Sequence, residues 1–451
     1  MQPDAGFGLS MQEVKRRHIL PKALLVGVVA GLLASAFRIV LIMAERGRIG
    51  LLAGLPFAER VPVAVAIGVA GGALGVWAVR RFAPDAGGSG IPQIKGFVLG
   101  ERGIEWRRLL PVKFLAGLAG IGGGLALGRE GPTIQMGGST GLMVSEWFRV
   151  KPGEGERKAL IAAGAGAGLA AAFNAPLAGV MFVLEELAGN FTPVVLVAAF
   201  LASVSADIVG RVLTGEMPVF QLHAMPAPTV RALPAALLLG VACGLIGVLF
   251  NRCLLKSLDL YDRLRWPGWA MGALAGAAVG LAGAIYPGVA GTGGLLAERA
   301  LTGEIAVRWL AVLFLARFVL TMASYGTGAA GGIFAPLLVL GAIGGLAFGH
   351  AANFALPAFA PQPEVFAVIG MGGLLTAIVR APLTGIVLMI ELTGQYEFML
   401  PLLACSLVAY GIAEVLQEPP IYEALRERAK RQTAAGGSPS QASAEAPSGN
   451  T

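Results

Sequence analysis

Charged side chains are scarce in this chain. Only 14% of its 451 residues are Asp, Glu, Lys or Arg, and 56% are hydrophobic, giving a mean hydropathy of +0.73. Soluble globular proteins carry about 25% charged residues, so this composition excludes an ordinary soluble domain and indicates that the lipid bilayer is the solvent. No hydrophilic block of domain size interrupts the apolar segments between about residues 20 and 425. We therefore expect one membrane domain.

Cysteine and histidine are also rare. The three cysteines are odd in number and lie in or beside apolar segments, so they provide neither a disulfide framework nor metal-ligand spacing. The three histidines form no His-Glu-x-x-His pattern, which excludes that type of metalloprotease. No nucleotide-binding motif is visible. The sequence predicts a protein that needs neither a metal nor a cofactor.

Two short glycine-serine segments superficially match the motifs of serine nucleophiles: Gly87–Gly90 and Gly137–Gly141. A serine nucleophile needs a neighbouring base. Of the three histidines (His18, His223 and His350), only His350 lies in an apolar segment, and it has no evident orienting acid. An intramembrane serine hydrolase is thus a remote alternative, and we expect the protein not to be an enzyme.

The formal net charge is +7, but the basic residues occur in short runs at segment ends, namely Lys15–Arg17, Arg107–Arg108 and Arg426–Arg431. The positive-inside rule explains such runs better than a nucleic-acid partner does. Both termini are therefore expected in the cytoplasm, with an even number of crossings. The first apolar run, Ala23–Ala44, is long enough to span a membrane and has no signal-peptide cleavage pattern.

The chain contains a weak internal repeat. Three pairs of segments match in the same order, at offsets between 203 and 206 residues. The pairs are Gly88–Gly90 with Gly291–Gly293, Gly128–Pro132 with Gly332–Pro336, and Ala175–Glu185 with Ala381–Glu391. Repeats of Gly/Pro-interrupted apolar segments are typical of transporters whose binding site lies between the halves, near the bilayer midplane.

The repeat predicts five regions. Residues 19–220 form a first membrane repeat and residues 235–428 a second, inverted one. The linker 221–234 contains three prolines. We expect residues 1–18 to be a cytoplasmic N-terminal segment. The Ala-, Ser-, Gly- and Pro-rich residues 429–451 read as a disordered cytoplasmic tail.

The segment 128–132 places Arg129 and Glu130 inside an apolar region, where each charge costs about 2.5–3.5 kcal/mol on insertion scales. Pro132 favours the first turn of a helix, and the preceding glycines let the chain turn closely. Free N–H groups and the positive end of a helix dipole would then lie beside Glu130. The pattern predicts an anion site with a carboxylate at its entrance. The alternative is a local Arg129–Glu130 ion pair that only stabilises a loop.

Two further helix starts share this glycine-rich pattern. The repeat-related segment 331–336 carries no charge and offers the backbone N–H groups of Ile333 and Phe334. In segment 88–92, Ser89 is either an ordinary N-cap or a hydroxyl donor to an ion. Together the three starts could surround a dehydrated anion and still release it. The expected supporting loop residues are Gly88, Gly90, Gly128, Arg129, Gly131 and Gly332.

These segments resemble the signature segments of CLC chloride channels and transporters. The matching stretches are GSGIP (88–92), PVKF (111–114), GREGP (128–132), FNAPLAG (173–179), GGIFAP (331–336) and PPIY (419–422). The resemblance covers roughly residues 20 to 428. It implies an all-α polytopic membrane protein with the inverted-repeat CLC fold and many short, tilted and broken helices.

The resemblance also implies roles for individual residues. The hydroxyls of Ser89 and Tyr422 and the N–H groups of Ile333 and Phe334 would bind chloride. Glu130 would be the gating glutamate that exchanges protons with the outside, and Glu186 the internal proton-transfer glutamate. Without the resemblance, Tyr422 would be read as a membrane-interface aromatic, and Glu185–Glu186 as a solvated acidic pair.

The function implied is the exchange of chloride for protons across the membrane. Ionised Glu130 and chloride compete for the same donors, so protonation of Glu130 frees the site for chloride. An internal glutamate such as Glu186 is typical of the exchangers of this family and typically absent from its channels. The nearest alternative is an uncoupled chloride channel of the same fold, gated by voltage or pH.

Two positions bear on selectivity. Ser89 is the residue associated in this family with a preference for chloride, whereas nitrate-preferring relatives often carry proline there. The fluoride-exporting branch departs from GSGIP and lacks the tyrosine. Gln93 stands where a glutamate is common, past the anion-facing turn, and we expect it to affect selectivity little.

The resemblance further implies a homodimer in the lipid bilayer with one pathway per subunit. The chain after about Arg428 is too short for the regulatory cytoplasmic domains that many relatives carry. We therefore expect a multi-pass protein of a prokaryotic inner or plasma membrane.

Overall fold

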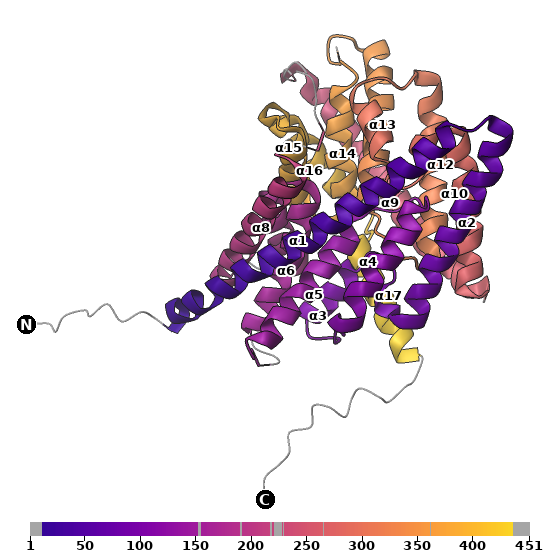
Figure 1. Ribbon diagram of the computed structural model, residues 1–451. Helices are drawn as coiled ribbons and strands as arrows, with labels where there is room; N and C mark the ends of the chain where they lie inside the picture. Colours follow the sequence, from indigo (N-terminus) through magenta and orange to yellow (C-terminus); the bar gives the residue numbers. More distant parts are fainter. Residues whose placement is uncertain are drawn as a thin grey trace, which may run out of the picture.

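The computed structural model describes residues 11–151, 155–189, 192–216, 219–220, 228, 230–264, 266–360 and 362–435. Within these ranges the protein is almost entirely helical (Figure 1). The first-half helices are α1 (Met11–Ala53), α2 (Phe57–Phe82), α3 (Ile91–Val98), α4 (Trp106–Gly122), α5 (Glu130–Trp147), α6 (Gly155–Phe173), α7 (Pro176–Phe182) and α8 (Pro193–Thr214). The second-half helices are α9 (Leu233–Leu264), α10 (Gly268–Ile285), α11 (Gly294–Leu301), α12 (Val307–Gly326), α13 (Phe334–Ala355), α14 (Val365–Val379), α15 (Pro382–Thr393), α16 (Met399–Val415) and α17 (Ile421–Ala435).

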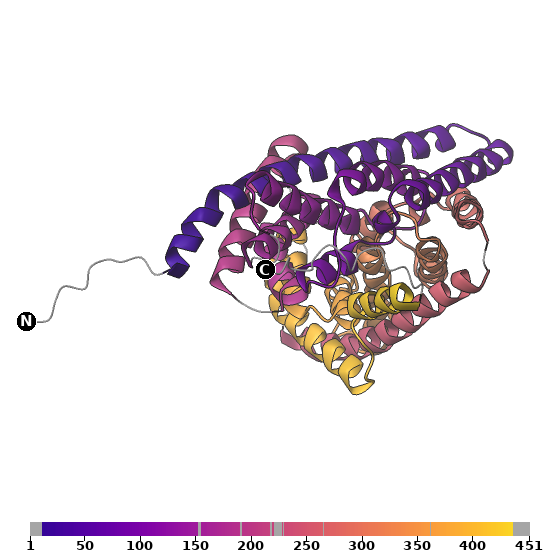
Figure 2. The ribbon, with the colours of Figure 1, turned by 90° about the horizontal axis from the view of Figure 1, so that it is seen from below.

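Eight helices of the described chain are long and apolar enough to cross a membrane: α1, α2, α8, α9, α10, α12, α13 and α16. The helices cross at varied tilts, with α1 running obliquely over the bundle (Figures 1 and 2). In the described ranges, β-type pairing consists of two isolated bridges, Gly88 with Ala330 and Gly128 with Gly332. The expected all-α polytopic fold with many short and broken helices is confirmed.

Close packing through glycine repeats itself in the two halves. A Cβ atom at Gly137 of α5 would lie 2.1 Å from the carbonyl oxygen of Gly164 in α6. In the second half, a Cβ atom at Gly341 of α13 would lie 2.6 Å from the carbonyl oxygen of Gly370 in α14. Such small-residue contacts let membrane helices pack backbone to backbone. The two helix pairs thus pack through the same kind of contact.

The C-terminal helix differs from the tail expected at residues 429–451. Helix α17 continues to Ala435 because residues 424–435 are rich in Ala, Glu, Arg, Lys and Gln, which favour helix. Arg428 also pairs with Asp259 and Asp262 on α9. Residues 436–451 lie outside the described chain.

The other expected boundaries are partly visible. Most of the linker predicted at 221–234 lies outside the described residues, and α9 already begins at Leu233. Helix α1 begins at Met11, inside the predicted N-terminal segment, whereas residues 1–10 are outside the description. The beginning of α1 and helix α17 both lie toward the lower side of Figure 1.

Candidate functional site

Three glycine-rich helix starts meet in the interior. The N–H of Gly128 donates to the carbonyl of Gly332 at 2.6 Å, and the N–H of Gly332 donates back to Gly128 at 2.8 Å. The N–H of Gly331 donates to the carbonyl of Gly88 at 3.2 Å. These bonds tie the starts of α3 and α5, from the first half, to the start of α13, from the second.

Ser89 lies at the centre of this junction. Its side chain is buried, and its Oγ accepts a hydrogen bond from the N–H of Ile91 at 3.2 Å. The N-cap of α3 is the next residue, Gly90, so Ser89 is not the helix cap. The hydroxyl also lies within hydrogen-bonding reach of the buried phenol of Tyr325 on α12. A Cβ atom at position 131 would lie 2.6 Å from the carbonyl oxygen of Ser89, so only glycine lets α5 start this close to the loop.

Lys113 of α4 holds the Ser89 loop in place. Its side chain is fully buried, and its Nζ donates to the carbonyls of Ala86 at 2.9 Å and Gly88 at 2.7 Å. Lys113 has no role among the sequence-based expectations, although a single lysine in an apolar segment is itself a signal for a functional or structural contact.

Glu130 begins α5 and points to the start of α13. Its side chain is 2% exposed, and its Oε2 accepts a hydrogen bond from the N–H of Ala335 at 3.2 Å. Ile333 and Phe334, the expected chloride ligands, immediately precede Ala335 at the same helix start. The carboxylate therefore occupies a position where a free anion would bind, at the positive end of a helix. The expected ion pair is also present, with 3.7 Å between Arg129 Nε and Glu130 Oε1.

Tyr422 lies in the first turn of the last helix, and its side chain is fully buried within the protein. Its hydroxyl has no hydrogen-bond partner among the described residues. Glu130, Glu186 and Tyr325 lie close enough to interact with its phenol electrostatically. A buried polar group without a partner is costly, so this hydroxyl is suited to a bound ion.

Glu186 lies on the short π-helical turn Val183–Leu187 that follows α7. Its side chain is 5% exposed, and its Oε1 lies 2.8 Å from the Nζ of Lys95. The alternative of a solvated acidic pair is therefore wrong for Glu186. π-Helical turns are frequent at functional sites.

Glu185, its neighbour, joins the two halves instead. Its carboxylate accepts hydrogen bonds from the N–H groups of Leu383 at 3.1 Å and Thr384 at 2.8 Å, at the start of α15. Glu391, the repeat partner of Glu185, accepts in the same way from the N–H groups of Leu177 at 3.0 Å and Ala178 at 2.7 Å, at the start of α7. The repeat-related glutamates cap each other's helices.

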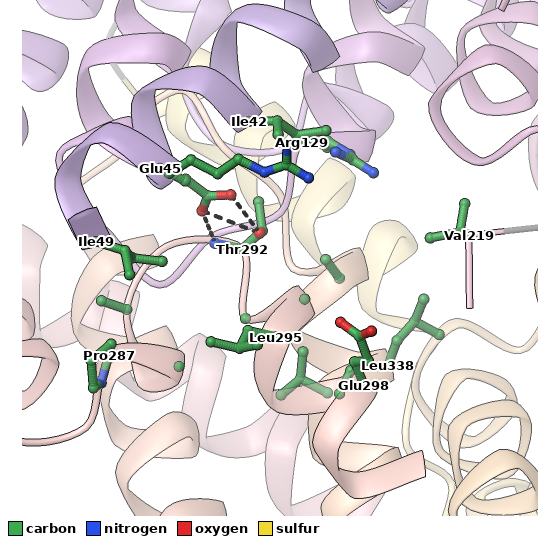
Figure 3. Close-up of a pocket in the computed structure, with 18 of the residues that line it drawn as sticks. Ile42, Glu45, Ile49, Arg129, Val219, Pro287, Thr292, Leu295, Glu298 and Leu338 are labelled. Carbon is green, nitrogen blue, oxygen red and sulfur yellow. Dashed lines mark hydrogen bonds between the residues drawn. The ribbon is translucent and has the colours of Figure 1, made fainter. Parts of the chain in front are cut away.

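A cavity of about 390 Å³ reaches Glu130 and Arg129 (Figure 3). It is also lined by charged side chains of α1 and α11, among them Glu45, Arg46 and Glu298. The carboxylate of Glu45 accepts hydrogen bonds from the N–H of Thr292 at 2.7 Å and from its hydroxyl at 3.1 and 3.0 Å. Among the described residues, no group of three or more His, Cys, Asp or Glu side chains is arranged to hold a metal.

The family model described as voltage gated chloride channel matches residues 71–414. The "H(+)/Cl(-) exchange transporter ClcA" of Salmonella paratyphi A is 40% identical over 420 residues, covering 91% of this chain and 88% of that protein. The protein of the same name from Vibrio cholerae serotype O1 is 42% identical over 421 residues, covering 91% and 89%.

Solved structures show the same relationship. A slow cyanobacterial Cl⁻/H⁺ antiporter superposes with a TM-score of 0.86 and 37% identity, over 92% of this chain and 99% of that one. A eukaryotic CLC transporter, at 24% identity, shares the fold with a TM-score of 0.75 over 91% of this chain and 74% of that one. The chain belongs to the voltage-gated chloride channel family, the CLC family, and has its fold.

Proposed function

We propose that this protein exchanges chloride for protons across a cell membrane. The observation that carries the proposal is the hydrogen bond between the Glu130 carboxylate and the N–H of Ala335, near the Tyr422 hydroxyl, which has no hydrogen-bond partner in the described part of the chain. A carboxylate that sits where an anion would bind is displaced either by the anion or by its own protonation. The names of the relatives, which are proton/chloride exchangers, support the same function.

The anion site consists of groups without a full positive charge. Ser89 and Tyr422 provide hydroxyls, and the start of α13 provides the N–H groups of Ile333 and Phe334. The loop glycines allow the close approach of the three helix starts. A neutral cage holds chloride weakly enough for release, and Ser89 supports chloride over nitrate or fluoride as the cargo.

The coupling follows from the positions of two glutamates around Tyr422. Glu130 lines the cavity shown in Figure 3 and meets protons from that side. Glu186 also lies close enough to the Tyr422 phenol to interact with it electrostatically, and its carboxylate pairs with Lys95. When Glu130 is protonated it leaves its backbone donor, and chloride takes the donors. When chloride leaves, Glu130 returns and passes its proton inward through Glu186, so the ions move in opposite directions.

The assembly and orientation belong to the same proposal. We infer a homodimer with one pathway per subunit, in an inner or plasma membrane, with both termini in the cytoplasm. The basic runs at the chain ends support this orientation.

Purified protein in liposomes tests the function directly. An outward chloride gradient should drive protons inward, against their own gradient. Glu186→Gln should stop proton movement while chloride still moves, because a glutamine cannot carry the proton. Glu130→Gln should leave chloride movement without proton coupling.

Glu298→Gln is the matched control, since Glu298 lines the same cavity without belonging to the proposed site. It should leave coupling unchanged. Chloride flux without any proton movement in the unsubstituted protein would instead show an uncoupled channel of the same fold.

A further inference from the structure

Lys95 lies on α3, directly behind the Ser89 loop, and faces two carboxylates. Its Nζ lies 2.8 Å from Glu186 Oε1 and 3.5 Å from Glu423 Oε2. The lysine side chain is 18% exposed and that of Glu423 is 32% exposed, whereas Glu186 is buried. One ammonium group is thus shared between a buried and a more accessible carboxylate.

Glu423 is itself held by a second cation. Arg426 hydrogen-bonds Glu423 one turn further along α17 and also pairs with Glu101. The hydrogen bond from Arg426 lowers the pKa of Glu423, and the nearby Lys95 acts in the same direction. An acid with a lowered pKa stays ionised until the pH falls through that value, so Glu423 remains an anionic partner for Lys95 throughout the neutral range.

The other charged groups around Glu186 are accounted for. Glu185, its neighbour, is bonded to the start of α15. On α6 and α8, which pack against the same turn, the charged residues pair elsewhere or line another cavity. These are Glu156 with Lys22, Arg157 with Glu146, Asp207 with Arg211, and Lys158 beside Leu99. Lys95 and Glu423 are the pair left to respond to the charge of Glu186.

We propose that Lys95 is a positioning residue whose ammonium group alternates between Glu186 and Glu423 as Glu186 releases and binds its proton. While Glu186 is ionised, the pair at 2.8 Å is the favoured one. Protonation removes the charge of Glu186, and Lys95 then gains more from the ionised Glu423, only 3.5 Å away. The lysine therefore sets the proton affinity of Glu186. When Glu186 is protonated, the electrostatic attraction of the lysine for Glu423 on α17 becomes the stronger one.

This shift reaches the anion site, because Glu423 directly follows Tyr422 at the start of α17. A stronger attraction between Lys95 and Glu423 draws the start of α17 toward α3, the helix that carries Ser89 at its beginning. The two proposed hydroxyl ligands of chloride thus lie at the starts of the two helices that Lys95 connects, Ser89 in the turn before α3 and Tyr422 in the first turn of α17. Proton arrival at Glu186 is communicated to the anion site through one side chain.

The inference rests on the proposed exchange function, and the test separates the two. Proton transport into or out of liposomes is measured as a function of the internal pH, and the pH of half-maximal transport is compared between variants. Lys95→Met removes the cation, so Glu186 binds its proton more tightly and the midpoint moves up by about one pH unit. Glu423→Gln leaves the ammonium to Glu186 alone and moves the midpoint down. Lys95→Arg keeps the charge and restores a midpoint close to that of the unsubstituted protein.

Lys430→Met is the matched control, because Lys430 lies on α17 and pairs with Glu101 at 3.3 Å, away from Glu186. It should leave the midpoint in place. If Lys95→Met fails to fold, Glu423→Gln still tests the inference, because its midpoint should move down relative to that of the unsubstituted protein. The inference would be overturned if the midpoints of Lys95→Met and Glu423→Gln equalled that of the unsubstituted protein, or if both moved in the same direction. The exchange function would still stand. A complete lack of proton transport by the unsubstituted protein would overturn both.

Discussion

The loop before α3 and the loop before α11 are repeat-related, and they share one construction. Each contains two glycines with positive φ around a hydroxyl residue, namely Gly88, Ser89 and Gly90 in the first half and Gly291, Thr292 and Gly293 in the second. Each loop is held by a buried cation from the second helix after it, α4 in the first half and α12 in the second. Lys113 bonds two carbonyls of the first loop, and Arg317 bonds three of the second.

The loops differ in what binds their polar groups. The N–H and the hydroxyl of Thr292 both donate to the carboxylate of Glu45, which comes from α1 (Figure 3). Among the described residues, no carboxylate hydrogen-bonds Ser89. Its Oγ accepts from the N–H of Ile91 and lies beside the phenol of Tyr325. The second loop thus shows that this type of helix start binds an anionic group, here one supplied by the protein. We propose that the first loop offers the equivalent donors to a diffusible anion.

Removing the buried cations should give the largest effects. Arg317→Met leaves the carbonyls of Val289, Gly291 and Thr292 without their donor and should lower the free energy of unfolding by about 3 kcal/mol. Lys113→Met removes two such bonds and should cost about 2 kcal/mol. Lys113→Met should also lower chloride flux per folded molecule, because the first loop carries Ser89. Denaturation in detergent and flux in liposomes measure the two quantities.

Arg308→Met is the control for the cation pair, since Arg308 is exposed on the same helix as Arg317. A change of less than about 0.5 kcal/mol is expected there. Equal losses in Arg308→Met and Arg317→Met would show that the second loop does not depend on the buried cation.

The prominent parts of the site could be predicted because their determinants are contiguous in the sequence. Glu130 and Pro132 stand in one short segment, and the repeat revealed the helix start at Ile333. Other contacts join distant residues, such as Glu45 with Thr292, 247 positions apart. The local sequence around a glutamate does not indicate which distant backbone N–H groups its carboxylate will bind. The same holds for Glu185 and Glu391, which each bind N–H groups at the start of a helix in the other half.

One signal was present and could have been used. Lys113 and Arg317 lie 204 positions apart, the offset of the repeat, and both are single cations in apolar runs. Both side chains donate to carbonyl oxygens of the glycine loops, and this role becomes clear only when the positions of those carbonyls are known. The end of α17 was missed for a different reason, because a composition typical of disorder begins only after Ala435 and the ion pairs of Arg428 involve a distant helix.

The close approach of α5 to the first loop provides a second, smaller effect. Gly131→Ala would place a Cβ atom 2.6 Å from the Ser89 carbonyl oxygen. The resulting shift should cost about 2 kcal/mol of stability and weaken chloride binding about tenfold. Gly294→Ala in the second half is the control, since the nearest atom to its Cβ would be 3.9 Å away. Calorimetric titration with chloride should separate the two, and similar affinities in both variants would contradict a tight first loop.

The smallest effect is expected where the two hydroxyl residues are compared directly. Thr292→Val removes one of the donors to Glu45 but keeps the backbone N–H, so we expect a loss of about 1 kcal/mol in stability and unchanged chloride affinity. Ser89→Ala should do the reverse, with a weaker chloride affinity and little change in stability, because we propose that its hydroxyl binds the ion. Calorimetric titration and denaturation of the two variants measure both quantities. If Thr292→Val weakened chloride binding as much as Ser89→Ala, the second loop would belong to the ion pathway, and Glu45 would be a displaceable group there in the same sense as Glu130.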